Sequence, residues 1–147
     1  MKEPEKELSQ LLEIPQGLEQ MNKEDIYKYY FVTDQQPDEA YICEGDVFLS
    51  LKLNKDGFTK EQLQEYKTNV FDAVFSKGTA NYQSELKEAL NQIYYSFETK
   101  NETPSYIKAI AALHSKRLLY INFTCPLSKK AHWEPIIIQA FNSLKNQ

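Results

Sequence analysis

The chain has 147 residues, of which 41% are hydrophobic and 26% charged, a composition typical of one folded domain with a sizeable core. Its net charge of −4 provides no basic field, which argues against nucleic acid or an anionic membrane as a partner. The first residues lack the apolar core of a secretory signal, and no run approaches the roughly 18 apolar residues of a membrane helix, so we expect a cytoplasmic protein without membrane insertion, unless a lipoprotein signal was trimmed before Met1.

The N-terminal quarter predicts short elements separated by turns. Residues 1–9 are charged and contain a proline, so we expect a frayed end. Residues 10–14 predict a short edge strand that stops at the next proline. Asn22 is a suitable N-cap for a short helix ending near Tyr30, and residues 31–39 then form a loop.

A hairpin and a helix follow. Residues 40–43 and 46–54 predict its two strands, with Glu44-Gly45 as the turn. The second strand alternates clearly, which is typical of a strand with one buried face. Residues 60–76 then predict a helix, because a capping box precedes an apolar stripe at helical spacing and Gly78 follows as the C-cap.

The second half of the chain reads as an antiparallel meander. Residues 93–99, 106–113 and 118–125 predict three strands, and Ser115-Lys116 connects the last two. Residues 81–87 fit either a strand or a helix, because their alternation is weak and several of their charged residues suit a helix equally well.

The chain closes on a helix. Apolar residues from Trp133 to Leu144 recur with the spacing of an amphipathic helix, and Pro135 is compatible only with its beginning. Ser128 is a candidate N-cap. This order of elements predicts an α+β fold within one domain of residues 1–147, in which the second and third helices cover one face of an antiparallel sheet.

Three stretches of this sequence resemble the PsbP-like superfamily. They are its proline-containing opening segment, its last strand and its closing helix: Ile14–Leu18, Arg117–Pro126 and Trp133–Leu144. The resemblance extends over residues 11–145 and implies a PsbP-like α/β sandwich, although the hairpin expected near residues 21–38 is missing. That superfamily includes DcrB-like bacterial proteins, a Ran-binding nuclear import factor and the Eag chaperones of type VI secretion. It shares no active site, so the resemblance implies a binding or adaptor module and no catalytic residues.

The sequence contains little that indicates catalysis or a cofactor. Its two cysteines, Cys43 and Cys125, end predicted strands and are expected to be free thiols. With two histidines and no metal-ligand spacing we expect no metal, and without a glycine-rich loop we expect no nucleotide cofactor. The remaining enzymatic alternative is a small hydrolase or ligand-binding enzyme that uses Cys125 and His132, which flank one turn.

The stronger functional hypothesis is a non-enzymatic binding module. Aromatic and aliphatic side chains alternate opposite to the expected core positions and predict a tyrosine-rich patch on the open sheet face: Phe48, Tyr94, Tyr106, Ile110 and Tyr120. Tyrosine gives large contact areas at a small entropic cost, so this patch predicts binding of a protein partner or self-association as a homodimer. The alternative is that the aromatic residues of 27–31 cover the patch and form a second small core.

Overall fold

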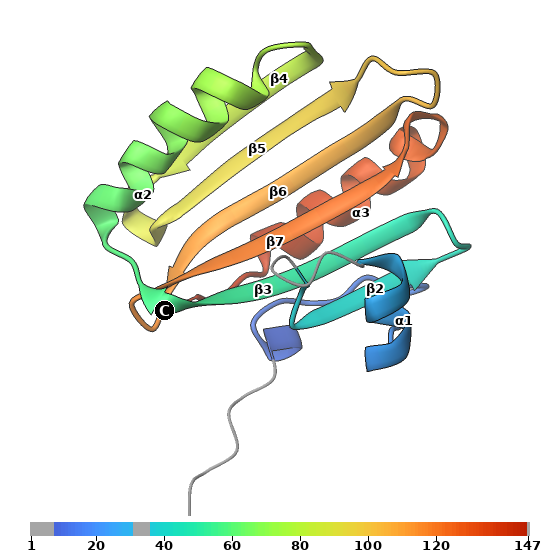
Figure 1. Ribbon diagram of the computed structural model, residues 1–147, viewed down its shortest axis with the longest axis horizontal. Helices are drawn as coiled ribbons and strands as arrows, with labels where there is room; N and C mark the ends of the chain where they lie inside the picture. Colours follow the sequence, from blue (N-terminus) through green and yellow to red (C-terminus); the bar gives the residue numbers. More distant parts are fainter. Residues whose placement is uncertain (1–7, 31–35, 147) are drawn as a thin grey trace, which may run out of the picture.

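The computed structural model describes residues 8–30 and 36–146, so the expectations for residues 1–7 and 31–35 lie outside it. These residues form one seven-stranded antiparallel sheet with the strand order β1-β2-β3-β7-β6-β5-β4 (Figure 1). The strands are β1 Glu19–Gln20, β2 Glu39–Cys43, β3 Val47–Gly57, β4 Thr79–Lys87, β5 Gln92–Thr99, β6 Ser105–His114 and β7 Arg117–Pro126. The predicted α+β class, the hairpin and the meander are confirmed, and residues 81–87 belong to a strand.

Helical segments connect and flank these strands. They are η1 Leu8–Gln10, α1 Lys23–Tyr29, α2 Lys60–Tyr66, η3 Lys67–Phe75, η4 Glu88–Leu90, η5 Leu127–Lys129 and α3 Lys130–Asn142. Asn22 caps α1 by accepting a hydrogen bond from the amide of Asp25, and the capping box of Thr59 and Gln62 begins α2. No helix among the described residues is long and apolar enough to cross a membrane.

α3 packs on one face of the sheet. Its Trp133, Ile137 and Phe141 are buried against the positions of β7 that include Ile121 and Phe123. Burying an apolar side chain of this size contributes about 1.5–3 kcal/mol, so this contact is a major stabilising term. α3 begins three residues earlier than predicted, and Ser128 is not its N-cap.

α2 and η3 pack on the opposite face. Leu63 and Phe71 are buried against Ile93, Ala109 and Leu118, the neighbours of the residues that face α3. Successive residues of a strand point to opposite faces, so the two helical layers lie on the two sides of the sheet, as Figure 1 shows. The expectation that both helices cover one face is therefore wrong.

The N-terminal strand predicted at residues 10–14 is also not formed. η1 ends at Gln10, and Leu11 and Leu12 are buried in the core under α3. The amide of Lys145 donates a hydrogen bond to the carbonyl of Leu11, at 2.7 Å, so the segment that follows η1 lies beside the segment that follows α3. Strand pairing in this region is made instead by β1 with β2.

The predicted helix of residues 60–76 changes its winding halfway along. η3 is a π-helix, in which residues five apart share a face, and Lys67 forms an ion pair of 2.6 Å with Asp72. Asp72 also accepts hydrogen bonds from Tyr82, at 2.7 Å, and from Ser84, at 2.6 Å. One carboxylate therefore joins the π-helix to β4.

A buried polar network fixes the C-terminus. The side-chain amide of Asn146, which is 4% exposed, donates to the carbonyl oxygens of Leu90, at 3.0 Å, and Leu113, at 2.7 Å. Its oxygen accepts from the amide of Gln92 at 2.7 Å, and Gln92 accepts from the hydroxyl of Tyr94 at 2.6 Å. These buried polar groups are hydrogen-bonded to one another, which fixes the position of the segment that follows α3.

Replacing Asp72 by Asn should destabilise the fold in a pH-dependent way. Burial alone would raise the pKa of Asp72, but hydrogen bonds from Lys67, Ser84 and Tyr82 together lower it. A lowered pKa adds stability above the unfolded pKa, and this stability is lost as the pH falls through the folded pKa. Urea unfolding should therefore show a loss of about 1 kcal/mol at neutral pH, since Asp72 is partly exposed, and a smaller loss below about pH 4. Glu65→Gln, at an exposed position of α2, is the control, and an equal loss in both variants would contradict the assignment.

Asn146→Ala should destabilise the protein by about 2–3 kcal/mol, because it leaves the Gln92 amide and two backbone carbonyls without their partner. The urea midpoint measures this loss. Lys145→Ala is the matched control, because Lys145 is exposed and keeps its backbone hydrogen bond to Leu11. If both variants unfold at the same urea concentration, the Asn146 network does not hold the tail.

Candidate functional site

The five residues predicted to form one open patch do not share a face. Tyr94, Tyr106 and Ile110 point toward α3 and are 9%, 2% and 0% exposed. Phe48 and Tyr120 lie on the other face, where Phe48 packs against Tyr29 of α1 at 5.5 Å between ring centroids. The expected common patch is wrong because α3 covers the face on which three of its members lie.

The remaining member of the patch, Tyr120, lies at a groove on the face opposite α3. The groove has a volume of about 440 Å³, and residues from several elements line it: Tyr30, Pro37, Ser50, Lys52, Asn54, Tyr66, Leu118, Tyr120 and Asn122. We call it the central groove. Its floor is β3 and β7, with α1 and its C-cap Tyr30 on one side and α2 on the other. It exists because α1 covers the β2 end of this face and α2 with η3 cover the β5 end.

Three hydroxyl groups of the central groove, those of Tyr30, Ser50 and Tyr120, are hydrogen-bonded to neighbours. Tyr120 and Tyr95 form a hydrogen bond between their hydroxyls, and Ser50 hydrogen-bonds Tyr30. Burial raises the pKa of both Tyr30 and Tyr120. These phenols are therefore neutral at physiological pH, and the groove presents aromatic surface with uncharged polar groups.

The floor of the central groove offers mainly side chains. β7 pairs with β3 and β6, and β3 pairs with β7 and, over Val47–Leu51, with β2. A ligand in this groove would have to be recognised by rings, hydroxyls, amides and Lys52. None of the described residues that line the groove is a nucleophile with an adjacent base.

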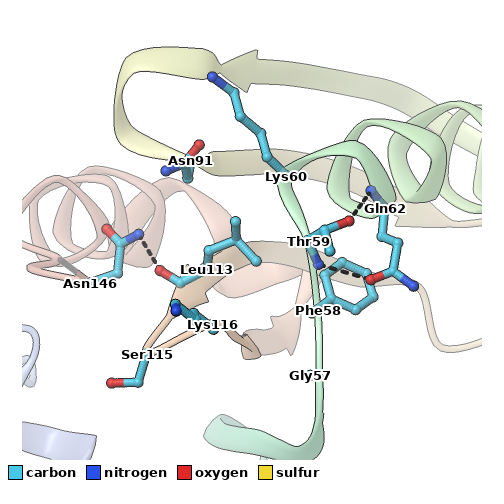
Figure 2. Close-up of a pocket in the computed structure, with 10 residues that line it drawn as sticks. All are labelled: Gly57, Phe58, Thr59, Lys60, Gln62, Asn91, Leu113, Ser115, Lys116 and Asn146. Carbon is cyan, nitrogen blue, oxygen red and sulfur yellow. Dashed lines mark hydrogen bonds between the residues drawn. The ribbon is translucent and has the colours of Figure 1, made fainter.

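A second hollow lies at one end of the sheet, where α2 begins (Figure 2). It has a volume of about 540 Å³ and is lined by Gly57, Phe58, Thr59, Lys60, Gln62, Asn91, Leu113, Ser115, Lys116 and Asn146. Figure 2 shows that Thr59 and Gln62 bond each other and that Asn146 bonds Leu113. The polar side chains of Thr59, Gln62 and Asn146 in this hollow are thus used to cap α2 and to hold the end of the chain, rather than being free to bind a ligand.

Cys125 and His132 lie in different surroundings. Cys125 is fully buried under α3, and burial, followed by the nearby Asp46 carboxylate, raises the pKa of its thiol to about 11. His132 is exposed and its ring contacts Trp133 edge-on. Both cysteines are free thiols, as predicted, and no cluster of three metal-ligating side chains occurs within residues 8–30 and 36–146.

Polar residues in the sequence indicate the central groove, although the search for tyrosines did not find it. Ser50, Lys52 and Asn54 of β3 and Asn122 of β7 occupy the positions opposite to the apolar core positions of these strands. Polar residues on two adjacent central strands indicate a part of a sheet that no other layer covers. The groove is found by following these polar positions together with Tyr120.

Comparisons with known proteins bear on the fold alone. No family model and no curated protein sequence matches this chain. The chain is similar to the solution structure of cyanobacterial PsbP (CyanoP) from Synechocystis sp. PCC 6803, at 15% identity and a TM-score of 0.51. The match covers 91% of this chain and 84% of that chain. The chain therefore has the expected PsbP-like fold.

Proposed function

We propose that this protein is a non-enzymatic binding module and that its central groove holds a segment of a partner protein. The observation that carries the proposal is the position of the groove, between α1 and the α2–η3 helix on a strip of sheet that no described helix covers. Three tyrosines, Tyr30, Tyr66 and Tyr120, line it. Tyrosine is favoured at binding surfaces because it combines a rigid apolar ring with a polar end.

The chemistry of the groove favours a polypeptide over a charged small molecule. Lys52 is the one charged residue among those that line it, and the others are aromatic, aliphatic, hydroxyl or amide groups. Amides such as Asn54 and Asn122 can donate to and accept from a peptide backbone, and the rings provide apolar contact. A partner segment with alternating apolar and polar groups matches this pattern.

A chaperone-like or adaptor role is the form of this function that the resemblance to the Eag chaperones implies. Holding a segment of another protein needs an open surface, a stable scaffold and no chemistry. The packing of α3 on the opposite face of β7 provides a rigid scaffold beneath the groove. We infer that the protein presents the groove without large rearrangement.

Groove-filling variants test this function. Ser50→Arg and Asn122→Arg each place a long charged side chain in the groove while leaving the cores on both faces intact. Each should weaken capture of a cellular partner about tenfold or more, because the bound segment would have to displace or bury an unpaired guanidinium. The measurement is quantitative affinity capture, with unfolding midpoints to show that the variants fold.

The matched control is Gln139→Arg, at an exposed position of α3 on the opposite side of the sheet. A benzophenone amino acid placed at Asn54 should crosslink a partner, whereas the same group at Gln139 should not. Equal capture by the groove variants and the control would show that the groove does not bind the partner.

Thiol labelling distinguishes this function from a cysteine-dependent hydrolase. With Cys125 fully buried and its pKa raised to about 11, native protein should react with a thiol reagent through the half-exposed Cys43 alone. Cys43→Ser should therefore show no rapid labelling until urea unfolds the chain. Fast labelling of this folded variant would show that the thiol of Cys125 is reactive and would support a cysteine-dependent hydrolase instead.

A further inference from the structure

β4 ends the sheet with a long edge, whereas the other end, β1, has two residues. An edge strand presents unpaired peptide groups that can bond another strand. Among the residues described, no strand pairs with the outer side of β4. This edge is therefore the place at which the sheet can be extended.

The hydrogen-bond pattern identifies which peptide groups of β4 face outward. The amide of Leu113 in β6 donates to the carbonyl of Asn91 at 3.0 Å, so alternate residues beginning at Asn91 bond β6. Gln92, Tyr94 and Ser96 of β5 then bond β4, and their register partners in β4 are Lys87, Glu85 and Gln83. The peptide groups of Ser84 and Leu86 consequently point away from the sheet.

We propose that two copies of this chain pair through β4 in antiparallel orientation about a two-fold axis, which joins their sheets. A two-fold contact is self-complementary, so one strand supplies both halves of the interface. The open stretch is short, because Asn81 has a positive φ of 54° and a bulge interrupts the register between Ala80 and Gln83. Such an edge favours one defined pairing over open-ended aggregation.

Strand length and charge together select the register of this pairing. An axis at Leu86 would pair only Glu85–Lys87, because β4 ends at Lys87. An axis at Glu85 would place Glu85 directly opposite the partner's Glu85, and like charges at opposing positions are destabilising. An axis at Ser84 instead pairs the outward peptide groups of Ser84 with those of the partner's Ser84. It places Gln83 opposite the partner's Glu85, where the amide can donate to the carboxylate, and both side chains are exposed. We therefore place the axis at Ser84.

Exposed apolar side chains flank the same edge. Val74, in η3 just before β4, is 56% exposed, and Leu90, just after β4, is 46% exposed. In an antiparallel pair the start of one β4 lies beside the end of the other. Val74 and the partner's Leu90 are thus brought to the same end of the interface, where contact would remove apolar surface from water.

Two charge variants at one exposed position test the proposal with the full chain. With the axis at Ser84, Gln83→Lys places two opposite-charge pairs across the interface, and Gln83→Glu places two like-charge pairs. Sedimentation equilibrium over a concentration series should show a dimer whose Kd is lowered about 2- to 30-fold by Gln83→Lys and raised by a similar factor by Gln83→Glu. Gln139→Lys and Gln139→Glu, which make the same charge changes on α3, should leave the Kd unchanged.

A proline variant tests the backbone contact itself. Ser84→Pro removes an outward amide without removing a donor from the β4–β5 ladder, and should abolish the dimer. Ser84→Ala is its matched control, because both variants lose the hydroxyl bond to Asp72 and Ser84→Ala alone keeps the amide. Circular dichroism establishes that each variant is folded. A mass of one chain at every concentration, or the opposite order of the two Gln83 variants, would overturn the proposal.

Discussion

The packing of α3 on the central strand β7 is the contact on which the rest of the structure depends. β7 pairs with both β3 and β6, and its Ile121 and Phe123 lie under the helix with no exposure. The two-residue turn at Ser115 and Lys116, both with positive φ, sets the β6–β7 register and with it the face on which each apolar residue lies. Because β6 in turn fixes β5, a shift at this turn would move apolar side chains of several strands out of the cores.

Two helical layers on opposite faces explain both the stability of the sheet and its remaining opening. α3 spans one face, while α1 and the α2–η3 helix share the other, so the described helices leave a strip over β3 and β7 between them. The π-helical winding of η3 places Lys67 and Asp72 together and directs the carboxylate toward Tyr82 and Ser84. This anchor fixes the position of η3 against β4.

The sequence predicted the hairpin, the three strands of residues 93–125 and the α+β class because alternation and turn residues are local signals. It could not reveal which helix covers which face, since that depends on contacts between distant segments. One signal was available, because Ala109, Ile110, Ala111 and Ala112 run together without alternation, which is typical of a strand covered on both faces. The π-helix and the Asn146 network were not predictable, because each depends on partners that only the fold brings together.

Tyrosine has two distinct roles in this molecule, and the helical layer above its ring decides between them. The hydroxyls of Tyr94 and Tyr82 donate hydrogen bonds to Gln92 and Asp72. Both tyrosines can therefore pack within the fold without leaving a hydroxyl unpaired. Tyr120 is likewise bonded to Tyr95, but it lies where the second layer is interrupted and thus contributes to the groove. A tyrosine-rich sheet face is therefore not in itself a binding surface, because helices cover most of it. The groove is a candidate site because Tyr120 lies there beside polar residues of β3 and β7. Polar residues at these positions would be costly if another layer covered this part of the sheet.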